Sequence, residues 1–193
     1  MRFCKKKKKE KFFTNNKKLP LCAFDTCSTI VFLFVVVILV FTFVVRDVSV
    51  SGISMNDTLM QDDKLILTNF NYTPKPNDIV AINAEDKIDK IIIKRVIATE
   101  GQTIKIDYDT GNVIVDGIIL DEDYTSSLTQ KPSEKEYWDI PYVVPDGCIF
   151  VLGDNRGASL DSRSKRLEFI SEENVLGKAQ FIVFPFDRFS YLY

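Results

Sequence analysis

Serine and lysine are the residue types most able to do chemistry in this chain, because its 193 residues include no histidine. Without imidazole, the Ser-His-Asp and Cys-His arrangements of hydrolases are excluded, and so are histidine metal ligands. A hydrolase with this composition must activate its nucleophile in another way, for example by pairing a serine with a neutral, desolvated lysine. Two segments meet that requirement.

The first segment, residues 51–59, contains Ser51, Gly52 and Ser54. A glycine close to a serine allows a sharp backbone turn, which can aim a hydroxyl and a backbone N–H at one point. A nucleophile with an oxyanion donor requires that arrangement. The same pattern is also typical of an ordinary turn, so by itself it indicates only a candidate.

The second segment is the apolar run 91–97, which contains Lys94. Strand alternation would place Lys94 on the same face as Ile92 and Val96, with Arg95 on the opposite face. A lysine on an apolar face either extends to water or is buried with a lowered pKa. Lowering the pKa from about 10.4 to near 7–8 requires on the order of 4 kcal/mol of desolvation.

A third polar segment, residues 153–163, directly follows the apolar run 148–152. It contains two aspartates, two arginines and two serines within eleven residues. Paired carboxylates and guanidinium groups at this density indicate a hydrogen-bond network that fixes geometry, although a surface loop could have the same composition.

Short β-rich runs surround these segments and predict a mainly β fold. Each run is rich in Ile, Val and Phe and is bounded by Gly, Pro, Asn or Asp. The runs are 64–70, 78–82, 90–97, 103–106, 112–115 and 148–152. Turn signals at 109–112 and 116–117 predict hairpins, and residues 171–174 predict one helical turn with Ser171 as its N-cap. We expect an antiparallel β-sandwich or a partly open barrel.

Residues 28–45 contain no charge, proline or glycine. As a helix they would span about 27 Å, enough for a thin bilayer core, so we predict a single N-terminal transmembrane helix. The expected organisation is a basic cytoplasmic tail (1–27), a transmembrane signal anchor (28–45) and an extracytoplasmic domain (46–193). The alternative, a cleaved signal peptide, is less consistent with the length of the run and with the absence of a small-x-small site at 44–47.

Charge divides unevenly along the chain. The first 20 residues carry a net charge of +8, so the remainder carries −10 within a total of −2. The positive-inside rule places the N-terminus in the cytoplasm, and the acidic body argues against nucleic-acid binding. Beyond the anchor Cys148 is the sole cysteine, which excludes a disulfide within the domain.

Two further segments are predicted to lie outside the regular strands. Residues 124–142, with the single tryptophan Trp138, favour a long loop. The aromatic C-terminus, 181–193, predicts a closing core strand followed by a tail, with contact to the membrane interface as the alternative.

The segments at 51–59, 94–102 and 153–163, taken together, resemble the type I signal peptidases, which are membrane-anchored Ser/Lys proteases. Residues 153–163 match the family's G-D-N-R-x-x-S-x-D-S-R pattern in full. The resemblance implies that Ser54 is the nucleophile and Lys94 the general base. It also implies supporting and pocket roles, in which Ser159 positions the lysine ammonium, Asp161 and Arg163 order their loop, Gly52 lies beside the oxyanion hole, and Met55 lies beside the substrate pocket.

The chain departs from the family pattern at four positions: Asp57, Ala98, Glu100 and Gln102. Asp57 replaces a proline, and a carboxylate close to Lys94 would raise the lysine pKa unless it pointed to solvent. Gly52 offers no hydroxyl to the oxyanion hole.

The resemblance implies a membrane-anchored serine endopeptidase that cleaves signal peptides after small residues, with no cofactor and no metal. Its expected partners are the signal peptides of secreted preproteins and the lipid bilayer, and we expect a monomer. The alternatives are a specialised relative with a narrow substrate set, a non-catalytic membrane-anchored binding module, and an anchored regulator that cleaves itself.

Overall fold

A computed structural model describes residues 21–43, 45–125, 127–131 and 142–192. Most of the predicted tail (1–20) and the greater part of the 124–142 loop, including Trp138, lie outside the described residues. The chain divides into two units, one ending at Leu39 and the other running from Val40 to Tyr193.

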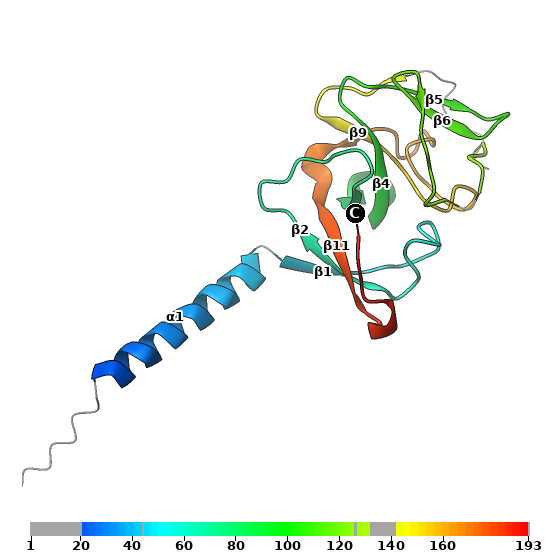
Figure 1. Ribbon diagram of the computed structural model, residues 1–193. Coiled ribbons are helices and arrows are strands. Elements are labelled where there is room, and N and C mark those ends of the chain that lie inside the picture. The colour runs from blue at the N-terminus through cyan, green and yellow to red at the C-terminus, as the bar shows by residue number, and fades with distance from the viewer. Residues whose placement is uncertain (1–20, 44, 126, 132–141, 193) are drawn as a thin grey trace, which may run out of the picture. The chain divides into compact units, whose positions relative to one another are not determined.

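The apolar N-terminal run forms the helix α1 (Leu21–Phe43), drawn in blue in Figure 1. Its side chains are described for residues 25–39. Counting only described residues, no helix is both long and apolar enough to cross a membrane. The predicted segment 28–45 overlaps α1 over residues 28–43, and Val45 is the first residue of strand β1.

From Val45 onward the described chain is mainly antiparallel β structure, as predicted. The larger sheet has the order β1-β2-β11-β3-β4-β9-β10, with β12 paired to β11. Its strands are β1 (Val45–Ser49), β2 (Lys64–Thr68), β3 (Ile79–Asn83), β4 (Ile91–Thr99), β9 (Cys148–Leu152), β10 (Ile170–Ser171), β11 (Val175–Phe184) and β12 (Ser190–Tyr191).

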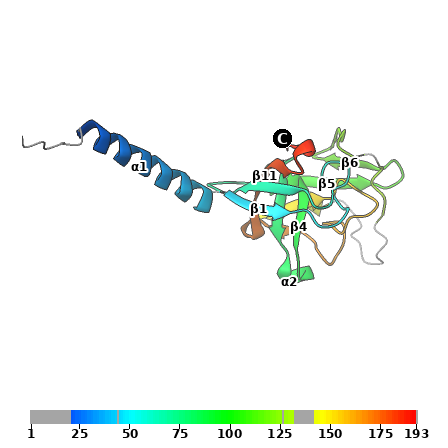
Figure 2. The same cartoon turned by 90° about the horizontal axis from the view of Figure 1, so that it is seen from below.

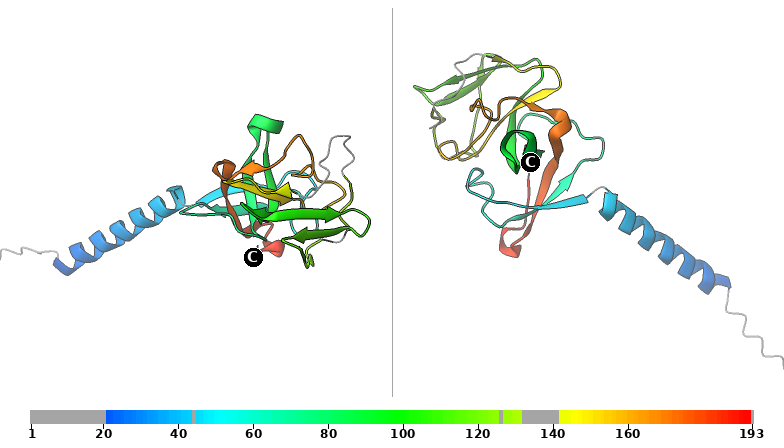
Figure 3. Two further views of the ribbon diagram at one scale, coloured as in Figure 1. Left: turned by 90° about the horizontal axis from the view of Figure 1, so that it is seen from above. Right: turned by 180° about the vertical axis from the view of Figure 1, so that it is seen from behind.

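The smaller sheet has the order β7-β6-β5-β8. It consists of β5 (Thr103–Asp107), β6 (Asn112–Val115), β7 (Ile118–Ile119) and β8 (Tyr142–Val143). Its hairpins use the predicted turns at 109–112 and 116–117. Figure 3 shows this sheet at one end of the larger one, which it joins through the β4–β5 turn.

Short helical turns connect some of the strands. The helix α2 (Glu85–Ile88) was not predicted, and it lies at the tip of the β3–β4 hairpin (Figure 2). The predicted turn after Ser171 is the 3-10 helix η1 (Glu172–Asn174), where the Ser171 hydroxyl accepts the N–H of Glu173. A second 3-10 helix, η2 (Phe186–Arg188), follows β11.

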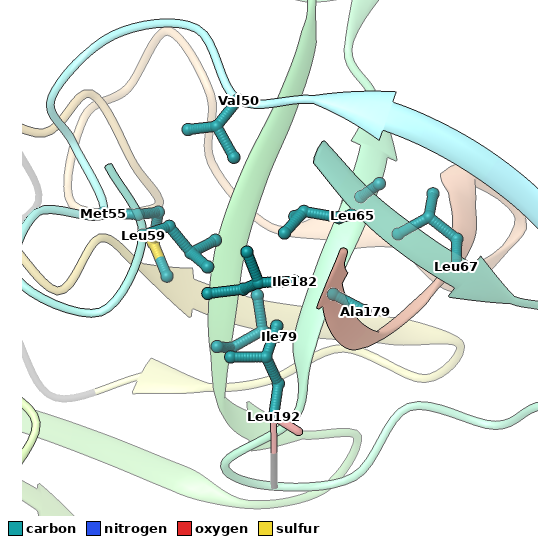
Figure 4. Packing of buried hydrophobic residues seen from close by; sticks show 10 residues of the cluster. Val50, Met55, Leu59, Leu65, Leu67, Ile79, Ala179, Ile182 and Leu192 are labelled. Carbon is teal, nitrogen blue, oxygen red and sulfur yellow. The ribbon is translucent and has the colours of Figure 1, made fainter. Parts of the chain in front are cut away.

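Apolar packing fixes the segment that carries Ser54. Met55 and Leu59, which follow Ser54, are buried against Leu65 of β2 and Ile182 of β11 in one core cluster (Figure 4). A second cluster lies between β3, β4 and β9, and a third joins the two sheets through Phe150 and Ile104. The turn that holds the candidate nucleophile is therefore anchored by the main core and is not a free surface loop.

Candidate active site

The turn at 51–59 holds Ser54 on a defined backbone. Gly52 has φ +94°, a conformation that L side chains rarely adopt, and a Cβ there would meet nothing within 4 Å, so conformation and not space requires glycine. One turn of hydrogen bonding follows, from Leu59 N–H to the Met55 carbonyl at 2.8 Å. Ser54 itself is half-buried.

Lys94 lies against this turn. It sits in β4 opposite Val80 of β3, and only 2% of its surface is exposed. Its Nζ donates a hydrogen bond to Ser54 Oγ at 2.6 Å. The structure therefore brings together the serine and the lysine that the sequence indicated, and Lys94 is buried and does not extend to water.

The electrostatic surroundings of Lys94 favour its neutral form. Burial lowers its pKa from 10.5 to about 8, the carboxylates of Asp161 and Asp154 oppose this effect, and the Arg163 guanidinium adds to it. Asp57 is exposed and is not among these groups, so the expected conflict between Asp57 and Lys94 does not arise. Its φ of +42° is a left-handed conformation that proline cannot adopt.

The 153–163 segment forms the predicted charge network next to the dyad. Arg163 binds both carboxylate oxygens of Asp161, at 2.8 and 2.9 Å, and Asp161 also accepts the Gly153 N–H at 3.2 Å. Burial alone would raise the pKa of Asp161, but the Arg163 guanidinium holds it below its usual range. The predicted ordering pair is therefore present as a buried bidentate ion pair.

A second buried ion pair connects this segment to β4 and to the Ser54 turn. Arg95, the neighbour of Lys94, binds both oxygens of Asp154 at 2.9 and 2.7 Å. Asp154 also accepts the Thr58 hydroxyl at 2.5 Å. Because β4 is covered on both faces, Arg95 is only 4% exposed. Its buried charge is compensated by Asp154, which lies 59 residues away in sequence.

Ser159 does not form the expected hydrogen bond with Lys94. Its Oγ is buried and has no hydrogen-bond partner among the described residues. The Ser159 hydroxyl helps to lower the pKa of the Asp161 carboxyl. However, no contact of Ser159 Oγ meets both the distance and the angle that a hydrogen bond requires. A buried acceptor next to the dyad is consequently left available.

Gly153 lies close to both Ser54 and Ser159. A Cβ built on Gly153 would overlap the Ser54 carbonyl oxygen and Ser159 Oγ, and it would lie 2.6 Å from Ser159 Cβ. Glycine is therefore required for close approach, independently of its backbone angles. The sequence showed this glycine only as part of a pattern, because the close contact is made by residues distant in the chain.

The three remaining departures from the family pattern fit locally, away from Ser54. Ala98 is buried in the core that joins the two sheets. Glu100 accepts the Gly147 N–H at 2.9 Å, and Gln102 accepts the Thr99 N–H at 3.0 Å. These residues shape the β4–β5 turn and do not contact Ser54.

A groove of about 600 Å³ leads to the dyad. Residues 48–52 form one wall and residues 90–93 the other, with Ser54, Met55 and Lys94 at the site itself. β4 pairs with β3 along Ile91–Arg95 but with β9 only from Arg95 onward, and β1 pairs only with β2. Within the described residues, both walls therefore present strand edges without a partner strand.

Met55 has two roles in this geometry. It lines the groove, and it is also a buried member of the main core. Among the described residues, no cluster of three or more ligand groups could hold a metal ion.

Comparison with known proteins agrees with the motifs. A family model described as signal peptidase, peptidase S26, matches residues 23–184. The signal peptidase I P of Bacillus subtilis subsp. natto is 32% identical over 186 residues, which cover 91% of this chain and 97% of that protein. The signal peptidase I of Bacillus licheniformis is 34% identical over 185 residues, covering 91% and 95%. The chain therefore belongs to the signal peptidase family and is a hydrolase of the serine peptidase type.

A solved structure is also similar. The signal peptidase I from Enterococcus faecalis V583 is 30% identical, with a TM-score of 0.44, and the match covers 55% of this chain and 97% of that one.

Proposed function

We propose that this chain is a membrane-anchored endopeptidase that removes N-terminal signal peptides from exported preproteins, with Ser54 as nucleophile and Lys94 as general base. The observation that carries the proposal is the 2.6 Å hydrogen bond between Lys94 Nζ and Ser54 Oγ. With a pKa of about 8, about a tenth of Lys94 is neutral at pH 7 and about half at pH 8, and the neutral form can accept a proton.

In the proposed mechanism, Lys94 Nζ takes the Ser54 hydroxyl proton while Oγ attacks the carbonyl carbon of the scissile bond. The Ser54 backbone N–H stabilises the resulting oxyanion. The Lys94 ammonium then gives its proton to the departing amine, and the C–N bond breaks to leave an acyl-enzyme. Neutral Lys94 next takes a proton from a water molecule, which attacks the ester carbonyl. The Lys94 ammonium then returns that proton to Ser54 Oγ as the ester C–O bond breaks and the signal peptide is released. Ser159 Oγ can accept a hydrogen bond from the Lys94 ammonium that forms transiently.

The groove supports an extended peptide substrate. Its two strand edges can hydrogen-bond to a peptide backbone, the usual basis of recognition by strand addition. The walls are largely apolar, with Val48, Val50, Ile91 and Ile93 among their residues, which suits the apolar part of a signal sequence. Selectivity for small residues before the cleaved bond follows from the family resemblance.

The proposed anchor is the segment 28–45, preceded by the tail 1–27 and followed by the peptidase domain 46–193. The uncharged sequence of that segment supports insertion, and the N-terminal lysines support a cytoplasmic N-terminus and an extracytoplasmic peptidase domain. The domain also carries exposed aromatic residues near its C-terminus, in two sets of ring contacts: Phe181 with Phe189 and Tyr191, and Phe184 with Phe186. The group consists of Phe181, Phe184, Phe186, Phe189 and Tyr191, and its composition suits the membrane interface.

The test is cleavage of a preprotein with an Ala-x-Ala site by the full chain in detergent, compared with Ser54→Ala. We expect cleavage by the wild type at the predicted site and none by the variant. Binding of the preprotein by both proteins without cleavage would contradict the proposal and would favour the non-catalytic binding module.

A further inference from the structure

Asn155 makes two hydrogen bonds to the backbone around Ser54. Its side-chain Nδ2 donates to the Ile53 carbonyl at 3.0 Å, and its backbone N–H donates to the Ser54 carbonyl at 3.1 Å. Asn155 lies 102 residues from Ile53 in sequence. Two successive carbonyls beside the nucleophile are thus held by one residue of the 153–163 segment.

The first of these bonds acts on the peptide group that contains the oxyanion donor. The Ile53 carbonyl and the Ser54 N–H belong to the same planar, trans peptide unit, so they point in opposite directions. Fixing the direction of the carbonyl therefore fixes the direction of the N–H. Among the described residues, the Ser54 N–H donates to no other group, which leaves it free for a ligand.

We propose that Asn155 is a positioning residue that, through the Ile53 carbonyl, aims the Ser54 N–H at the oxyanion of the tetrahedral intermediate. This inference rests on the proposed function and adds to it a residue that does not touch the substrate. The side-chain bond also polarises the Ile53–Ser54 amide, which makes its N–H a stronger donor. Gly52 gives the preceding backbone the freedom to turn, and Asn155 sets the final direction.

The experiment compares Asn155→Ala and Asn155→Asp with the wild type. The alanine variant removes only the side-chain donor and keeps the backbone bond to Ser54. The aspartate variant keeps the size and shape of the side chain but places a carboxylate oxygen, which cannot donate a hydrogen bond, next to the Ile53 carbonyl oxygen. Gln180→Ala is the matched control, since it removes a side-chain amide bond of 3.0 Å to Thr68 in another part of the sheet.

The measurements are kcat and KM on the Ala-x-Ala preprotein, the pH profile, and the affinity for two peptide probes. One probe is a peptide boronic acid, which forms a tetrahedral adduct on Ser54, and the other is the same peptide without the boron. Loss of alignment of one oxyanion donor lowers kcat by about 10- to 100-fold. We expect that loss in kcat and in boronate affinity for both variants, with KM and the plain peptide's affinity unchanged. The pH limb should be unchanged in Asn155→Ala, which adds no charge.

Full kcat in Asn155→Ala and Asn155→Asp would overturn the inference. So would an equal loss of affinity for both probes, or a shifted pH limb in Asn155→Ala, because these would show that Asn155 only supports the fold. Thermal unfolding of each variant separates such a loss from global unfolding. If the wild type shows no Ser54-dependent cleavage, the proposed function itself fails, and this outcome is distinct from normal activity in the Asn155 variants.

Discussion

Replacing Lys94 by methionine should abolish peptidase activity and at the same time stabilise the fold. Burial lowers the pKa of Lys94 from 10.5 to about 8. Burying this side chain therefore costs about 3 kcal/mol of folding stability below pH 8, where Lys94 is protonated in both the folded and the unfolded chain. Methionine removes that cost and loses a hydrogen bond to Ser54 worth about 1 kcal/mol, so we expect a net gain of about 2 kcal/mol near pH 7.

The gain should depend on pH in a defined direction. Between pH 8 and 10.5 the unfolded chain binds a proton at Lys94 that the folded chain does not bind, so wild-type stability rises with pH through this window. The advantage of the methionine variant should therefore be full below pH 8 and decline by about 1.4 kcal/mol per pH unit above it. It should vanish near about pH 9.5 and become a deficit of about 1 kcal/mol above pH 10.5, where only the lost hydrogen bond remains.

The assay combines thermal unfolding in detergent at several pH values with preprotein cleavage. Wild-type kcat/KM should fall by about tenfold per pH unit below pH 8, because the fraction of neutral Lys94 falls in that proportion. The methionine variant should lose at least about 10³-fold in activity. A variant less stable than wild type at pH 7, or a wild-type limb centred near pH 10, would refute the assignment of a buried neutral lysine.

Three further substitutions test the surrounding geometry. Gly153→Ala should lower kcat by at least about 100-fold in cleavage assays, since its Cβ would displace the backbone of Ser54. Adding Ser159→Ala should restore only part of the activity, because the contact with the Ser54 carbonyl oxygen remains. Asp57→Pro should destabilise the fold by about 1–3 kcal/mol, because the backbone φ of residue 57 is positive and proline cannot adopt it. Asp57→Gly should be neutral or stabilising. A melting temperature of Asp57→Pro equal to that of the wild type would contradict this prediction. Arg95→Met and Asp154→Asn should each lower the free energy of unfolding by about 3–5 kcal/mol, measured by denaturant unfolding. The double variant should lose less than the sum of the two single losses. Strict additivity would show that the pair is not coupled.

Most of the strands of four or more residues could be predicted because their signals are local. Strands β6 and β9 were predicted at their observed bounds, and β2, β3, β4 and β5 within two residues at either end, from β-branched runs between turn residues. The first six residues of β11 were missed, since 175–180 alternates buried positions with Leu176, Lys178 and Gln180 and has no apolar run to mark it. Strand β1 was missed because its sequence continues directly from the apolar run and forms a strand only by pairing with β2.

The sequence by itself limited the chemistry open to this protein, because the absence of histidine left a serine paired with a neutral lysine as one route for a hydrolase. The resemblance of three segments to a known family then implied that this pair is Ser54 and Lys94. The sequence could not decide whether Lys94 reached water, because burial depends on strands that approach from elsewhere in the chain. Only the tertiary structure placed its Nζ 2.6 Å from Ser54 Oγ, paired Arg95 with Asp154, and brought Asn155 to the Ile53 carbonyl. These contacts join residues between 40 and 102 positions apart, so no local pattern could have shown them.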